Sequence, residues 1–149
     1  MIEDLYTKLV RDYKKLEALR KEMYKEPESF KKALLKAFID ILQRNAFNFP
    51  SVGMYDFRFE IGTTVYYLDN LRLKRFTIKE DGVNVYQKEF QMVVDKFYFD
   101  VYNNKRYESE LISKEELLWI KEQVETKYPM ETWEFFEIVP TTVGEANNS

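Results

Sequence analysis

The stretch from Met54 to Leu111 constrains the fold more than any other part of this 149-residue chain. Short runs of alternating, β-branched or aromatic residues follow one another there, separated only by turn residues. Parallel strands need a crossover connection of about a dozen residues or more, and the stretch leaves no room for one. It therefore predicts an antiparallel β-meander of about four to six strands, joined by short turns.

Hydrophobic periodicity places the individual strands. From Met54 to Ile61, apolar residues alternate with charged ones, which predicts a strand with one buried and one solvated face. The remaining predicted strands are Val65–Leu68, Leu71–Lys79, Phe90–Val94, Phe97–Tyr102 and Tyr107–Leu111, with a helical turn as the alternative for Phe90–Val94.

Within the third of these strands the apolar residues change phase, from Leu71 and Leu73 to Phe76 and Ile78. A β-bulge near Lys74–Arg75 would produce this change, and so would a strand that is covered on both faces. Both interpretations stay open.

Three dipeptides mark the turns. Asp81-Gly82 is the strongest hairpin signal in the chain, because type I′ turns need positive φ and Asp-Gly supplies it. Asn103-Asn104 predicts a second hairpin, since asparagine tolerates the left-handed region. Asp69-Asn70 predicts a turn or a bulge for the same reason.

Residues 2–25 carry apolar residues at helical spacing, which predicts an amphipathic helix. Two interpretations of its apolar stripe stay open. Either the helix packs against its own sheet, or residues 2–23 form a coiled-coil seam with a second copy or another partner. The stripe consists of Ile2, Leu5, Leu9, Leu16, Leu19 and Met23.

Two further helices are predicted. One runs from Glu28 to Asn45, after Pro27, because proline is favourable at the start of a helix. The other runs from Ser113 to about Lys127, where Ser113 opens an S-x-x-E capping box. Pro129 disfavours helix at the residue before it and ends this helix.

These elements predict a single α+β domain over residues 1–149. Its parts are a helical region with two helices (1–50), an antiparallel sheet (51–111), one C-terminal helix (112–128), an aromatic and acidic segment that is an edge strand or a docking segment (129–139), and a mobile tail (140–149).

Charge is distributed unevenly along the chain, whose formal net charge is −3. Residues 1–50 carry a net charge of +3, residues 51–110 of −1 and residues 111–149 of −5. A domain that binds duplex nucleic acid usually has a concentrated basic surface, so this distribution argues against such a partner. No stretch has the pattern of a secretory signal or a membrane span, which predicts a cytoplasmic protein.

The chain contains no histidine and no cysteine. Ser-His and Cys-His catalytic pairs, imidazole or thiolate metal sites and disulfides therefore cannot form. The sequence also lacks a glycine-rich phosphate-binding loop. We therefore expect no cofactor and no enzymatic activity.

Two other patterns are better explained as ordinary surface. Ser29 and Lys32 have the S-x-x-K spacing of a serine nucleophile and its activating lysine, but the companion motifs are missing. Six carboxylates in the sheet region could bind a hard cation, yet most fall at turns or on solvated strand faces, so no metal site is predicted. They are Asp56, Glu60, Asp69, Asp81, Asp95 and Asp100.

A cluster of basic and aromatic residues in the sheet region is a candidate ligand site. Guanidinium groups beside aromatic faces suit phosphate-bearing ligands or unstacked bases. The same composition is also typical of any half-exposed sheet. The candidate residues are Arg58, Tyr66, Arg72, Lys74 and Arg75.

The segment after the last predicted helix mixes acidic and large aromatic residues. Tryptophan and tyrosine are enriched in interface hot spots, and surrounding acids suit a basic partner. Alternatively, Trp133, Phe135 and Ile138 form a final strand or a cover on the core. The candidate docking residues are Glu131, Trp133, Glu134, Phe135, Phe136 and Glu137.

Together these features predict a non-enzymatic interaction protein that acts by surface complementarity on a basic, nucleic-acid-binding protein partner. A small accessory or inhibitor protein of a virus or mobile element, acting in the host cytoplasm, fits this description. The alternatives are a small-ligand or nucleotide-binding protein that uses the basic and aromatic cluster, and a structural subunit of an assembly.

Overall fold

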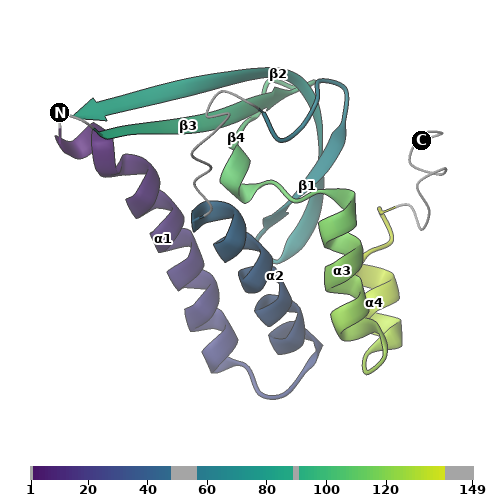
Figure 1. Cartoon of the computed structure of the whole chain (residues 1–149). Helices are drawn as coiled ribbons and strands as arrows, with labels where there is room; N and C mark the ends of the chain where they lie inside the picture. Colours follow the sequence, from purple (N-terminus) through teal and green to yellow (C-terminus); the bar gives the residue numbers. More distant parts are fainter. Residues whose placement is uncertain (1, 48–56, 89–90, 140–149) are drawn as a thin grey trace.

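The computed structural model describes residues 2–47, 57–88 and 91–139. Helices precede and follow the strands along the chain, which confirms the predicted α+β class (Figure 1). The elements are α1 (Ile2–Lys25), α2 (Phe30–Phe47), β1 (Thr64–Asp69), β2 (Arg72–Lys88), β3 (Gln91–Asp100), β4 (Lys105–Tyr107), the 3-10 helix η1 (Glu108–Glu110), α3 (Lys114–Glu125) and α4 (Pro129–Phe135).

The four strands form one antiparallel sheet in the order β1-β2-β3-β4. β2 connects the two halves of the sheet, because the beginning of β2 pairs with β1 and the rest of β2 pairs with β3. The register shifts between Ile78 and Glu80, where β2 passes from one partner to the other. In Figure 1 the long β2–β3 ribbon extends above α1 and α2, and the β1–β2 hairpin descends between α2 and α3.

The chain after β4 returns to the opposite edge of the sheet. Tyr66 in β1 and Ile112 exchange two backbone hydrogen bonds, with N···O distances of 2.9 and 2.7 Å. Ile112 lies directly before Ser113, the N-cap residue of α3, so this bridge fixes the start of α3 against β1. The outer backbone groups of β1 are thereby partly satisfied by the chain itself.

Two apolar clusters cover the two faces of the β1–β2 hairpin. One face, with Tyr66 and Leu73, packs against α2, α3 and the segment after α4. The other face, with Val65, Phe76 and Ile78, packs against apolar residues of the Phe57–Phe59 segment, β3 and Leu111. The first part of β2 is therefore covered on both faces, which accounts for its change of apolar phase. No bulge occurs at Lys74 or Arg75, where the pairing with β1 is regular.

The predicted hairpin at Asp81-Gly82 is wrong, because both residues lie inside β2. Gly82 pairs with Phe97 of β3, and a Cβ atom at Gly82 would lie 2.5 Å from the Phe97 ring. The glycine leaves room for an aromatic ring on the neighbouring strand, which is a different use of the residue from a turn.

The other two turn predictions are confirmed. Asn103 has a φ of 65° in the turn between β3 and β4, and Asn70 has a φ of 49° in the turn between β1 and β2. The return strand predicted at Tyr107–Leu111 is wrong in position, because β4 spans Lys105–Tyr107 and Glu108–Glu110 form η1.

The strand predicted from Met54 to Ile61 does not form in its described part. Residues 54–56 lie outside the described residues, and residues 57–61 are irregular. Phe59 is nevertheless buried, and its backbone N–H donates to the Tyr98 hydroxyl at 3.2 Å. In the described residues, the alternating pattern therefore reflects a loop that packs Phe57 and Phe59 against the sheet.

The predicted helices form with small shifts at their ends. α1 packs against α2 and β2, as expected for a helix that covers its own fold, and Leu16 is buried. The predicted edge strand over 129–139 is wrong, because this segment forms α4. Residues 140–149, predicted as a tail, lie outside the described residues. Among the described helices, none is both long and apolar enough to cross a membrane.

Candidate protein-docking surface

The start of α3 is fixed by the predicted capping box. The Ser113 hydroxyl accepts from the backbone N–H of Glu116 at 3.1 Å, and the Ser113 backbone N–H donates to the Glu116 carboxylate at 2.9 Å. Arg58 also donates to this carboxylate. Burial raises the pKa of Glu116, but the hydrogen bonds from Ser113 and Arg58 outweigh it, so the pKa lies below its usual value.

α4 begins where proline stops α3. Tyr128 has a non-helical backbone, with φ −132° and ψ 63°, as expected for a residue before proline. Pro129 is then the first residue of α4. The Tyr128 N–H still donates to Val124 at 2.9 Å, which keeps the connection tight. Figure 1 shows α4 folded back beside α3, and the two helices are in contact.

One side of the α4 segment belongs to the core. Phe136 has an exposed fraction of 4%, and Val139 is also buried. The Phe135 ring makes edge contacts with Phe30 and Phe38 of α2, with centroid distances of 6.1 Å for both. The Ile138 carbonyl accepts a hydrogen bond from Arg75 of β2 at 3.0 Å. These contacts anchor α4 on the rest of the fold.

The opposite side of α4 exposes large apolar groups. The exposed fraction is 69% for Trp133 and 68% for Met130. The two residues are three positions apart and therefore share one face of the helix. Tryptophan is the residue most enriched in interface hot spots, and here it lies on a backbone that the core holds in place.

Acidic side chains surround this apolar pair. Glu131, Glu134 and Glu137 are all exposed. On α3, Glu115, Glu122 and Glu125 are exposed as well.

The basic residues of the same region are engaged or buried. Lys121 lies 3.6 Å from Glu125, Lys127 lies over the Tyr128 ring, and Lys114 is buried. The described part of residues 111–139 thus presents mainly negative charge to solvent.

The six predicted docking residues therefore divide into two groups. Trp133 and the three glutamates face solvent, whereas Phe135 is half-buried and Phe136 is buried. The segment packs on the core as a helix and not as a strand, and its other side leaves Trp133 and the three glutamates exposed. Met130 was missed; its spacing from Trp133 would have identified it had the segment been interpreted as a helix.

The structure does not bring the predicted ligand residues into one site. Tyr66 and Arg75 are directly paired and share one face of the β1–β2 hairpin, while Arg72 and Lys74 extend from the opposite face. Tyr66 is buried, and Arg58 pairs with Glu116. A shared phosphate site of these residues has no geometric support.

Ser29, Lys32 and Asp100 have structural partners, and Asp56 lies outside the described residues. The Ser29 hydroxyl accepts from the Lys32 backbone N–H at 3.3 Å, and the Lys32 ammonium group lies 3.8 Å from Glu28, so Ser29 caps α2. Asp100 accepts from the backbone N–H groups of Tyr102 and Asn104 in the β3–β4 turn. Among the residues that the structure describes, no group of three or more acids could hold a metal ion.

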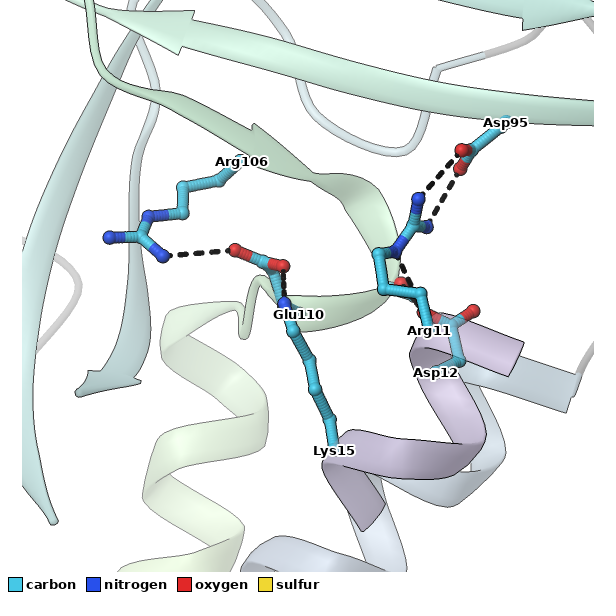
Figure 2. Close-up of polar contacts among 7 residues, drawn as sticks. Arg11, Asp12, Lys15, Asp95, Arg106 and Glu110 are labelled. Carbon is cyan, nitrogen blue, oxygen red and sulfur yellow. Dashed lines mark hydrogen bonds and ion pairs between the residues drawn. The ribbon is translucent and has the colours of Figure 1, made fainter. Parts of the chain in front are cut away.

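Among the predicted carboxylates that the structure describes, Asp95 is the most buried, and it pairs with α1. Arg11 donates to both of its carboxylate oxygens, at 2.8 and 3.0 Å (Figure 2). The same guanidinium group lies 3.4 Å from the centroid of the Tyr107 ring. No sequence spacing signals this pair, since its members are 84 positions apart.

Comparisons with known proteins identify no relative. No family model matches the chain, no curated protein matches it, and no solved structure matches its fold.

Proposed function

We propose that this protein is a non-enzymatic interaction module that binds the basic surface of a protein partner through α4. The observation that carries the proposal is the exposed Trp133 on a helix whose other side is anchored in the core. A tryptophan in this position combines a large contact area with little conformational entropy to lose on binding.

The surrounding charge defines the chemistry of the partner. Glu131, Glu134 and Glu137 lie on the same short segment as Trp133, and this segment has no basic residue in its last turn. Such a surface attracts lysine- and arginine-rich surfaces and speeds their association at low ionic strength. A nucleic-acid-binding protein exposes this kind of surface, so the module would compete there with phosphate groups.

The residue content of the chain supports binding rather than catalysis. Without histidine or cysteine, the usual nucleophile–base pairs are not available. The most buried described carboxylates all have partners: Asp95 pairs with Arg11, Asp100 accepts from backbone N–H groups, and Asp12 accepts from Ser109.

An array of short lysine- and arginine-rich, neutral and acidic peptides tests the proposal. Wild-type protein is expected to bind basic peptides, with an affinity that falls as salt is added, because exposed charges are screened. Trp133→Ala and the triple reversal Glu131→Lys, Glu134→Lys, Glu137→Lys are expected to lose this binding.

A second triple reversal controls for net charge. Glu60, Glu80 and Asp81 are exposed and lie outside α3 and α4, so replacing all three with lysine changes the net charge equally. This control variant is expected to bind the basic peptides as well as the wild-type protein does. Equal losses in both triple variants, or full binding by Trp133→Ala, would contradict the proposal.

A further inference from the structure

A groove of about 600 Å³ lies between α1, α2 and the β1–β2 turn. None of its described lining residues belongs to α3 or α4, so it is distinct from the docking surface. Its volume falls in the range of small-molecule sites, about 300–1,000 Å³. Most of its walls are apolar and come from Ala18, Leu19, Leu42, Leu68 and Leu71.

The turn that closes one side of the groove has an unusual residue. Leu71 has a φ of 62°, in the left-handed region that favours glycine or asparagine. A leucine side chain disfavours this backbone, and a glycine would relieve the cost. Leu71 lines the groove. The turn therefore places an apolar side chain in the groove at a position whose backbone conformation favours a residue without a side chain.

One end of the groove carries excess positive charge. Lys15 from α1 and Arg106 from β4 both approach Glu110, from different sides (Figure 2). Two cations thus share one carboxylate. Arg106 is held in place by the Tyr67 ring, whose centroid lies 4.2 Å from the guanidinium carbon. The Lys15 side chain is 49% exposed and can reach a ligand.

The neighbouring acids do not cancel this charge within the groove. Asp12 and Asp95 are buried near Arg11, and neither lines the groove. Asp12 also accepts a hydrogen bond from Ser109 at 2.9 Å.

The other end of the groove is locally compensated. Glu22 lies two helical turns beyond Lys15, about 10 Å along the axis. Its carboxylate is 3.6 Å from Lys31. Asp69 also lines the groove, and Arg72 lies directly opposite it on the neighbouring strand. The groove is therefore an apolar channel in which Lys15, Arg106 and Glu110 together leave one excess positive charge at the Lys15 end.

We propose that this groove binds an amphipathic carboxylate, with the acid group at Lys15 and Arg106 and an apolar body along Leu19, Leu42 and Leu71. The excess of one positive charge favours a carboxylate over a phosphate monoester, which carries about 1.5 to 2 negative charges at neutral pH. The apolar walls exclude purely polar metabolites.

Calorimetric titration with decanoate, decanol and decylamine tests this site. Decanoate is expected to bind saturably, and decylamine about tenfold or more weakly, because only the acid gains a charge-assisted hydrogen bond. Lys15→Met is expected to weaken the binding of decanoate but not the binding of decanol. Lys14→Met, a change of the exposed neighbour that does not line the groove, is the matched control and is expected to bind decanoate normally.

Leu71→Gly provides a second and independent test. The variant is expected to unfold at a higher denaturant concentration than wild type, because the turn loses its strain, and to bind decanoate less tightly. Equal binding of decanoate and decylamine, no saturable binding of decanoate, or unchanged decanoate affinity in either Lys15→Met or Leu71→Gly would overturn the proposal. None of these results depends on peptide binding at α4.

Discussion

The protein uses charge in opposite ways where α1 meets β3 and where α4 meets solvent. At the first place, Asp95 has an exposed fraction of 1% and is matched by the Arg11 guanidinium (Figure 2). At the second, Glu131, Glu134 and Glu137 are exposed, and none of the ion pairs among the described residues includes them. Matched and buried charges fix the geometry of the fold, whereas unmatched and exposed charges remain available to a partner.

The same contrast occurs within α4 itself. Its inward side is apolar and its outward side combines Trp133 with acids. If this division is correct, substitutions on the two sides separate loss of stability from loss of binding.

The largest effect is expected from Phe136→Ala. Phe136 belongs to the apolar cluster that contains Tyr66 and Leu73. Its replacement by alanine leaves a cavity and costs about 3–5 kcal/mol of unfolding free energy. Chemical denaturation measures this loss. A cost comparable to that of an exposed residue would show that α4 is not anchored as described.

Arg11→Met is expected to destabilise the protein by about 3 kcal/mol, the lower end of the range for a broken buried pair, because Arg11 itself keeps some exposure. The substitution leaves the Asp95 carboxylate buried without its guanidinium partner. The double variant Arg11→Met, Asp95→Leu removes both charges and is expected to recover most of the loss. A double variant as unstable as the single one would contradict this assignment.

Glu116 gives a smaller and pH-dependent effect. Its pKa is lowered in the folded state, so its stabilisation is present above the unfolded value of 4.5 and is lost as pH falls through the folded pKa. At neutral pH, Glu116→Gln is expected to cost about 1 kcal/mol, the typical contribution of a helix cap. Below pH 4 the difference between the two proteins is expected to shrink in urea unfolding, and a difference that grows with acid would refute the assignment.

The smallest effect on stability is expected from Trp133→Ala. A residue exposed to this degree is expected to change the unfolding free energy by no more than about 0.5 kcal/mol. The same variant is expected to lose basic-peptide binding. A large loss of stability would place Trp133 in the fold rather than in an interface.

The sequence predicted local features well. Ser113 and Glu116 marked the start of α3, Asn103 marked a turn, and the lack of crossover length identified an antiparallel sheet. Each of these features depends on residues that are close in the chain, where backbone geometry and side-chain chemistry act directly.

The features that failed depend on contacts between distant residues. Gly82 has the sequence of a turn, but the Phe97 ring on the next strand decides its use. The aromatic run at 133–136 divides between core and solvent only once it is helical, and the groove forms from residues of α1, α2 and β1 with no shared motif. Periodicity alone does not contain this information.

The fluorescence of Trp133 tests the central claim most directly, in a Trp119→Phe variant that leaves one indole. Titration with the basic peptide that binds best is expected to shift its emission to shorter wavelength and to protect it from a soluble quencher, with both effects weakening as salt is added. A peptide that binds the protein while the Trp133 indole stays fully accessible would contradict docking through α4.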